Sequence, residues 1–330
     1  MKSAPKQDRD DLAVVRSGKG AATFAAPSPR LPGWQRRDRR ISFLFLVPAL
    51  IFVLVFYVYP IAYNILMSVT RYTAKSFVTG EAPFVGLGNF QRLVNHPSFG
   101  TSVSNTIAFT LGSLFFQFTI GLAFALFFQR KFPLSGVFRA LLLVPWLMPV
   151  IVSGAVWVRL LDMDYGVVNF VVRTLGLTSQ PIAWLTDPHL APISVLIANI
   201  WIGIPFNMVV LYGGLQAIPE SLYEAAAIDG AGSWQRFRYI SWPLLRPVST
   251  VVLLLGLVYT LKVFDVIMAI TRGGPANVSH TLNTFAYSLS FTTLDFGLGA
   301  AAGDVLMAVV LVFGLIYLRY AYGVERELTG

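Results

Sequence analysis

The sequence contains no cysteine and only three histidines among its 330 residues. No disulfide framework or thiolate metal site is therefore available, and the wide separation of the histidines argues against a metal site built from imidazoles. Charged residues are also scarce, at 12%, against about 25% in soluble domains. Hydrophobic residues make up 55% of the chain. This composition predicts a protein that lies in a membrane.

The apolar residues gather into six runs, and each run is long enough to cross a bilayer, which takes about 20 residues. A backbone in hydrocarbon must satisfy its own hydrogen bonds, so each run is predicted to be a helix. Prolines inside the runs, from Pro48 to Pro205, predict kinks. The expected fold is an all-α integral membrane protein with six transmembrane helices. The predicted spans cover residues 42–67, 104–128, 140–158, 190–212, 248–270 and 299–318.

The distribution of lysine and arginine predicts the orientation. The two termini and the loops 129–139 and 213–247 carry 18 basic residues, whereas the opposite loops carry six. Because cytoplasmic loops are enriched in basic residues, both termini are predicted to be cytoplasmic. Residues 1–40 hold ten of the 25 basic residues. We interpret them as a disordered cytoplasmic tail, with no cleaved signal peptide and no role in binding nucleic acid.

The longest predicted cytoplasmic loop is expected to form a helical hairpin over residues 219–243. Ser221 to Ile228 is rich in Ala, Glu and Leu, which favour helix. Gly230 and Gly232 provide the break, because glycine accepts the left-handed conformation that ends helices. Ser233 is predicted to cap a second helix. Three consecutive alanines give the first helix a flat surface that another protein can approach closely.

The residues of this loop resemble the EAA motif of binding-protein-dependent ABC importer permeases. Ile240 and Pro243 extend the resemblance, which implies type I importer architecture. It also implies that the hairpin docks on a separate ATPase subunit and transmits its motion. An alternative role for Glu224 is to complete a capping box with Ser221. The residues expected to couple to the ATPase are Glu224, Ala225, Ala226, Asp229, Gly230, Ala231 and Gly232.

Other segments resemble the carbohydrate branch of that family, of the maltose and glycerol-phosphate type. They are 84–90, 205–208 and 263–275, the last of which contains Gly273-Gly274-Pro275. The resemblance implies a heterodimer with a second, non-identical permease, two ATPase subunits and an extracytoplasmic solute-binding protein in a bacterial plasma membrane. The phosphate-loop pattern is absent. The chain is therefore expected to be a transport subunit without enzymatic activity or cofactor, with ATP and Mg²⁺ held by the partner ATPase.

Ionisable and aromatic residues inside the spans are candidates for the solute path, because charges in a membrane usually face a cavity or each other. Lys262 and Asp265 are expected to share a helix face and to form an ion pair or line a cavity. Asp304 departs from the family pattern and is expected to pair with Lys262 or to bond a solute hydroxyl. Trp201, Asn207, Tyr259 and Phe264 are candidates for the rings and the amide of a sugar site. The alternative role for the aromatic residues is ordinary helix packing or the interfacial aromatic belt.

The predicted function is import of a sugar or sugar derivative by alternating access. Lys262 leaves open an anionic solute such as a glycerol phosphate or a sulfonated sugar. A self-sufficient ion-coupled secondary transporter is the alternative of a different class. A membrane-embedded enzyme is the third, although the sequence offers no clustered catalytic set.

Overall fold

The computed structural model describes residues 44–130 and 132–329, without the side chains of 318 and 320–329. The predicted tail, residues 1–40, lies outside the described residues. The chain divides into two units, Met1–Tyr57 and Val58–Gly330, which we describe separately. In the first unit, residues 44–57 are helical. In the second, regular structure among the described residues is helical apart from one bridge between Thr70 and Phe84.

The longest connections between helices come before α9 and before α14, and most of the long helices match predicted apolar runs. A helix over 44–53 leads into a π-helical turn, η1, just before Pro60. The elements are η1 (Leu54–Val58), α2 (Tyr59–Ser68), α3 (Ala74–Thr79), α4 (Gly88–Val94), α5 (Phe99–Phe128), α6 (Ser135–Leu147), α7 (Val150–Leu160), α8 (Val167–Thr174), α9 (Leu190–Gln216), α10 (Glu220–Ile228), α11 (Ser233–Arg236), η2 (Phe237–Ser241), α12 (Trp242–Leu261), α13 (Asp265–Ile270), α14 (Leu282–Tyr287), η3 (Ser288–Thr292) and α15 (Phe296–Thr329).

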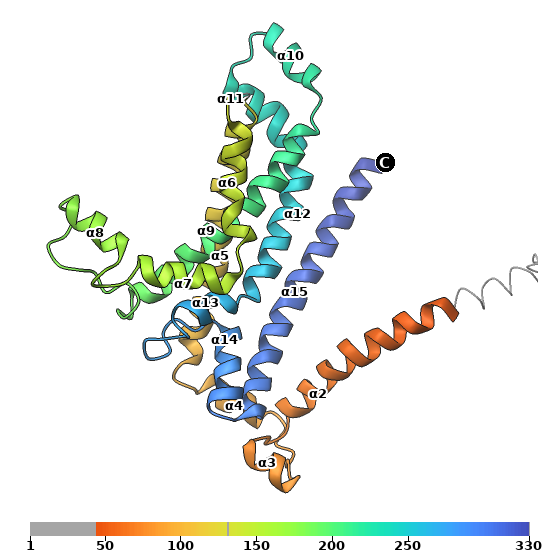
Figure 1. The fold of residues 1–330 in the computed structure, drawn as a ribbon. Coiled ribbons are helices and arrows are strands. Elements are labelled where there is room, and N and C mark those ends of the chain that lie inside the picture. The colour runs from red at the N-terminus through yellow and green to blue at the C-terminus, as the bar shows by residue number, and fades with distance from the viewer. Residues whose placement is uncertain (1–43, 131, 330) are drawn as a thin grey trace, which may run out of the picture. The chain divides into compact units, whose positions relative to one another are not determined.

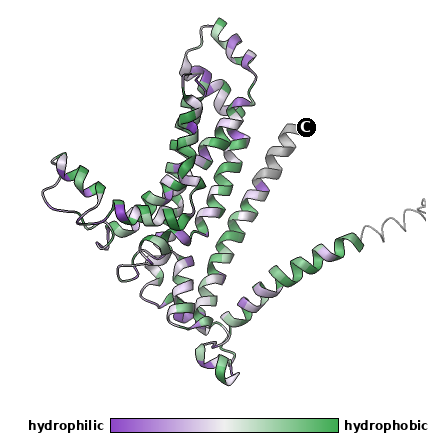
Figure 2. Ribbon diagram, viewed as in Figure 1, coloured by the Kyte–Doolittle hydropathy of each residue, from purple (hydrophilic) through white to green (hydrophobic). Residues whose placement is uncertain are grey.

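Five helices in the described part of the chain are long and apolar enough to cross a membrane, and a bent pair supplies a sixth candidate span. Figure 2 shows that hydrophobic residues predominate along these helices. The expected all-helical membrane fold is therefore confirmed. The five helices are Leu44–Ser68, Phe99–Phe128, Leu190–Gln216, Ser233–Leu261 and Phe296–Tyr317, and the pair is Ser135–Leu147 with Val150–Leu160.

The third predicted span, 140–158, is not one straight helix. α6 and α7 meet at a bend of 98°. Pro149 removes a helical hydrogen bond and disfavours the helical conformation of the residue before it. Met148 accordingly has extended backbone angles, with ψ of 141°. The proline predicted to kink this span therefore breaks it.

The fifth predicted span, 248–270, is also divided. α12 ends at Leu261, and Phe264 has non-helical angles before α13 begins at Asp265. The side-chain amide of Asn283 donates to the backbone oxygen of Lys262 at 2.8 Å, which satisfies one carbonyl released by the break. At its other end α12 is continuous with α11 and η2, so Ser233–Leu261 forms one helix of 29 residues.

The second unit is organised around α5 and α9, which pack along most of their lengths. Small residues allow the close approach. A side chain at Gly121 would collide with Asn207, and one at Gly203 would collide with Gln117. Interhelical hydrogen bonds and small residues commonly hold transmembrane helices together. Figure 1 shows α10 at one end of this unit and α3 and α4 at the opposite end.

Candidate functional site

The candidate solute site is a cavity beside the break between α12 and α13, which we call the central cavity. It has a volume of about 590 Å³. Four aromatic rings and several polar side chains line it, so it offers both flat apolar surfaces and hydrogen-bonding groups. Among its lining residues are Gln117, Trp146, Asn199, Phe206, Asn207, Tyr259, Thr260, Lys262, Phe264 and Asp265.

Five of the seven predicted solute-path residues line this cavity, and Trp201 and Asp304 do not. The Trp201 ring packs edge-on against Trp157, with the ring centroids 5.9 Å apart. The cavity instead uses Phe206, whose ring lies 5.8 Å from that of Trp146. Sequence reasoning missed both of these rings. Phe206 belongs to the 205–208 segment already singled out, so the signal for it was present.

Lys262 and Asp265 do not share a helix face as predicted, because the chain leaves the helix between them. The Lys262 ammonium instead lies 5.7 Å from the centroid of the Tyr259 ring. Within the described residues, the ion pair that forms joins Arg92 of α4 to Asp295 at 2.5 Å. Lys262 and Asp265 therefore present separate charges to the central cavity.

Asp304 has a partner that the sequence did not predict. The side-chain amide of Asn64, on α2, donates to the Asp304 carboxylate at 2.6 Å and to the backbone oxygen of Ala300 at 3.3 Å. Asp304 is thus bonded to Asn64 rather than to Lys262. The bond ties α2 to α15 inside the membrane, where an unpaired carboxylate is expensive.

Replacing Asn64 with alanine is expected to destabilise the protein by about 1–3 kcal/mol, because the Asp304 carboxylate loses its donor. The measurement is thermal unfolding of the purified protein. The double variant Asn64→Leu, Asp304→Leu should recover most of the loss, since both polar groups are then removed. Equal stability of Asn64→Ala and the parent protein would contradict this assignment.

Polar side chains connect α5 to α9 beside the central cavity. The Gln117 amide donates to the backbone oxygen of Asn199 at 2.9 Å, and the Asn199 amide donates to Ser113 Oγ at 2.9 Å. Asn207 donates to the backbone oxygen of Gly203 at 2.9 Å. Each of the three side-chain amides thus donates one hydrogen bond within this pair of helices. These bonds leave the side-chain oxygens of Gln117 and Asn207, which both line the cavity, available as acceptors.

A neighbouring cavity of about 400 Å³ lies between α2, α14, η3 and α15. Phe264 lines both this cavity and the central cavity. Its ring contacts that of Tyr287, with centroids 4.9 Å apart and planes at 68°. The Phe264 side chain therefore stands at the boundary between two spaces.

The Gly-Gly-Pro segment forms a tight loop that is fastened to α5. The Asn105 amide donates to the backbone oxygen of His280 at 3.0 Å, and Thr106 Oγ1 accepts from the Leu282 amide at 2.8 Å. Gly273 has a φ of +85°, and a side chain there would meet the His280 ring.

Burial lowers the pKa of His280, so the unfolded chain binds a proton at this residue more readily than the folded chain does. The loop is therefore expected to lose stability as the pH falls below the ordinary histidine value of about 6.5.

The predicted cytoplasmic hairpin is present as α10 and α11. Gly230 has a φ of +77° after the end of α10. The amides of Gly230 and Ala231 donate to the backbone oxygens of Ala227 and Ala226, at 3.1 and 2.8 Å. This pair of bonds is the Schellman motif. The break predicted at Asp229-Gly230 therefore has the geometry that glycine favours.

Two details of the hairpin differ from prediction. Pro219, not Ser221, precedes the first helical residue, and no side chain caps this helix, so Glu224 has no capping-box role. The second helix begins at Ser233, after Gly232. Gln235 Oε1 accepts from the Gly232 amide at 2.7 Å, so Ser233 is not the cap. Glu224 is exposed and available to a partner.

Tyr223 joins α10 to the membrane-spanning helices. The hydroxyl of Tyr223 is hydrogen-bonded to Ser241 Oγ at 2.9 Å. The Tyr223 ring also packs against a buried cluster that contains Leu211, Leu215 and Leu245. Leu222 and Ile228 of α10 are instead exposed, the latter by 87%. The hairpin thus has one face attached to the helices and one face open.

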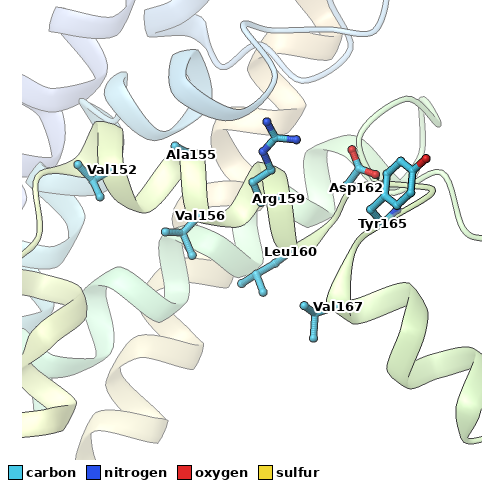
Figure 3. A pocket seen from close by; sticks show the side chains of 8 residues that line it. All are labelled: Val152, Ala155, Val156, Arg159, Leu160, Asp162, Tyr165 and Val167. Carbon is cyan, nitrogen blue, oxygen red and sulfur yellow. Dashed lines mark hydrogen bonds between the residues drawn. The ribbon is translucent and has the colours of Figure 1, made fainter.

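A further groove of about 520 Å³ follows α7 and the turn after it. Figure 3 shows Val156 and Leu160 projecting from one face of α7, with Arg159, Asp162 and Tyr165 toward its end. Most of its lining is apolar, and it contains none of the predicted solute-path residues. It suits a lipid-facing surface better than a site for a hydroxylated solute.

Comparison with known families agrees with this architecture. Residues 117–326, which include the central cavity, the hairpin and the Gly-Gly-Pro loop, match the family described as "Binding-protein-dependent transport system inner membrane component". The chain belongs to this family. The resemblance predicted from the alanine-rich loop is therefore confirmed, and the chain is a membrane transport permease.

Relatives of this permease match it over nearly their full lengths. The trehalose/maltose transport system permease protein of Thermococcus litoralis is 36% identical over 86% of this chain and 94% of that protein. The sulfoquinovosyl glycerol transport system permease protein of Agrobacterium fabrum is 34% identical over 88% and 94%. A solved bacterial alginate ABC transporter chain superimposes with a TM-score of 0.74, at 23% identity over 86% of this permease and 95% of that chain.

Proposed function

We propose that this permease imports a sugar or sugar derivative by alternating access, driven by a separate ATPase. One observation carries the proposal. The helix Ser233–Leu261 begins in the cytoplasmic hairpin and ends at the central cavity. A displacement of the hairpin can therefore reach the cavity through a single continuous element. Membership of the family indicates a transport function, and the geometry offers a route by which movement of the hairpin is coupled to the cavity.

The composition of the central cavity supports a carbohydrate solute. A pyranose has apolar ring faces and a rim of hydroxyls, and ligand sites combine aromatic walls with a few placed polar groups. Tyr259 and Phe264 offer ring faces, while Asp265 and Gln117 offer acceptors. Relatives carry names that specify trehalose/maltose, lactose, arabinooligosaccharides and sulfoquinovosyl glycerol.

The open face of the hairpin supports docking on an ATPase subunit. Glu224 and Ala225 are exposed, and Leu222 and Ile228 expose large apolar side chains beside them. Exposed apolar residues that gather in a patch mark interaction surfaces. In the proposed assembly, Glu224 to Gly232 contact an ATPase that holds ATP and Mg²⁺, and this chain performs no hydrolysis.

The remaining partners follow the family. We propose a second, non-identical permease, two ATPase subunits and an extracytoplasmic solute-binding protein that delivers the solute. The excess of basic residues on one side supports a plasma-membrane orientation with both termini in the cytoplasm. In this orientation the Gly-Gly-Pro loop and α4 face the solute-binding protein.

Purification and uptake together test the proposal. The tagged permease should retain an ATPase subunit through purification, and solute uptake should stop when that subunit is deleted. Uptake that persists without the ATPase would instead support an ion-coupled secondary transporter. Labelling that places residues 224–232 outside the cell would contradict the orientation.

Replacing Lys262 with methionine distinguishes neutral from anionic solutes. A hydrogen bond to a charged group contributes about 1.5–3 kcal/mol, so an anionic solute should lose about tenfold to a hundredfold in transport efficiency. A neutral sugar should lose less than about fivefold. The measurement compares uptake of lactose-like and sulfonated glycosides by the same cells. Arg173→Met is the control for removing one positive charge outside the cavity, because Arg173 is exposed on α8. Equal losses for both solutes would exclude Lys262 from charge recognition.

A further inference from the structure

A second cavity, which we call the hairpin cavity, lies between the hairpin and the adjoining ends of α5 and α9. Its volume is about 880 Å³. Residues of the hairpin and of the membrane-spanning helices contribute to it. Among its lining residues are Leu126, Gln129, Arg130, Leu215, Gln216, Ile218, Glu220, Tyr223, Trp234, Arg236 and Phe237.

The hairpin cavity contains an arginine with unused hydrogen-bonding capacity. Arg236 Nε is buried and has no hydrogen-bond partner among the residues that the structure describes. A buried donor without a partner costs free energy, and more so when it is charged. Arg130 lines the same cavity from the end of α5. Glu220 is the carboxylate of the lining, and among the described residues no ion pair joins it to either arginine.

The geometry of arginine indicates the chemistry of the missing partner. Its planar guanidinium presents several N–H donors in a fork that matches the oxygens of phosphate. Two arginines, one on α11 and one two residues after α5, line the cavity together with Gln129 and Gln216, so the lining contains several hydrogen-bond donors. The single carboxylate leaves the lining with a net positive charge. An anion with several oxygens satisfies this arrangement better than a neutral ligand.

The rest of the lining is apolar. Leu126, Leu215 and Ile218 contribute aliphatic side chains, and Trp234 is 72% exposed. Tryptophan is enriched where a protein meets the membrane interface. In the proposed orientation this cavity lies on the cytoplasmic side, where the leaflet carries anionic lipids. Phosphate can therefore reach it on a lipid headgroup or as a free anion.

We propose that the hairpin cavity binds a phosphate group through Arg236 and Arg130. Arg236 belongs to the second helix of the hairpin, whereas Arg130 follows α5. A phosphate held by both connects the hairpin to a membrane-spanning helix and limits their relative movement. Occupancy of the cavity thus tunes how stiffly the hairpin is attached. This site goes beyond the proposed function, since binding requires neither solute nor ATP.

Lipid binding by the assembled transporter tests the proposal. Native mass spectrometry, without solute or nucleotide, compares retention of phosphatidylglycerol with that of phosphatidylcholine. The parent protein should retain phosphatidylglycerol in preference. Arg236→Gln should need about fivefold more of it for equal occupancy, since a basic residue adds about 1 kcal/mol to binding of anionic lipid. Arg236→Lys should need an amount of phosphatidylglycerol between those of the parent protein and Arg236→Gln. Arg238→Gln is the matched control, because Arg238 is exposed and does not line the cavity.

A second arm distinguishes the source of the phosphate. Inorganic phosphate is added to transporter in nanodiscs of phosphatidylcholine alone, and thermal stability is measured. If phosphate raises the thermal stability of the parent protein but not of Arg236→Gln, and no preference for phosphatidylglycerol is seen, the ligand is a free anion. Preference for phosphatidylglycerol without stabilisation by phosphate assigns a headgroup. If Arg236→Gln and Arg130→Gln both match the parent protein in both arms, the proposal is overturned. Uptake is assayed separately, so failure of the transport assignment leaves this result unaffected.

Discussion

Cells that carry Gly230→Pro are expected to insert the permease normally and to show no detectable solute uptake. Gly230 sits at φ of +77° and its amide donates to Ala227. Proline fixes φ near −65° and has no amide hydrogen, so α10 can no longer end where it does. The surface from Glu224 to Gly232 then loses its shape. Uptake of labelled solute, normalised to the amount of permease in the membrane, is the measurement.

Graded variants separate the shape of the hairpin from general damage. Gly230→Asn should retain most activity, because asparagine tolerates the left-handed conformation, whereas Gly230→Ala should lose about 1–2 kcal/mol of local stability. Glu224→Lys should also abolish uptake without any change in backbone. Asp164→Lys, an equal charge reversal at an exposed position away from the hairpin, serves as its control. Normal uptake by both Gly230→Pro and Glu224→Lys would refute the coupling assignment.

Gly273→Ala is expected to destabilise the Gly-Gly-Pro loop by about 2–5 kcal/mol. Two effects add. Alanine at a φ of +85° is strained by about 1–2 kcal/mol, and its methyl group would overlap the His280 ring, which adds an overpacking cost of about 1–3 kcal/mol. The loop is fastened to α5 through Asn105, so we expect loss of uptake as well. Thermal unfolding of the assembled transporter measures the stability change.

The matched control for this variant is Gly176→Ala. Gly176 has a similar φ, of +71°, but open space where a side chain would lie. It should therefore show only the strain. Adding His280→Ala to Gly273→Ala removes the overlapping ring and should recover part of the loss. If Gly176→Ala and Gly273→Ala lower stability equally, the contact with His280 has no energetic role.

Features encoded by neighbouring residues could be predicted from the sequence. The apolar runs identified the membrane helices because length and hydrophobicity are local properties. The end of α10 was predictable because Gly230 supplies the conformation that stops it. Pro149 indicated a kink, although only the structure shows that α6 and α7 turn by 98°. Such features need no knowledge of the rest of the chain.

Features that depend on distant residues could not be predicted. No proline or glycine marks the break at Lys262 to Phe264. It is stabilised by Asn283, which lies on a later helix. Asp304 likewise bonds Asn64 from the other end of the chain. In the central cavity, Trp201 was expected and Phe206 is found. These positions lie about 140° apart around a helix, and sequence alone did not specify which face points inward.

The continuity of Ser233–Leu261 has a geometric consequence. A helix of 29 residues is about 43 Å long, so swinging it through about 5° around one end carries the other end along an arc of about 4 Å. α13 is a separate helix, because the chain leaves the helical conformation at Phe264, and it packs against α7 where Gly154 meets Ala269. We therefore expect α13 to stay in place when the longer helix tilts. A small rotation at the hairpin end of this helix would therefore become, at the cavity end, a displacement comparable to the width of an aromatic ring.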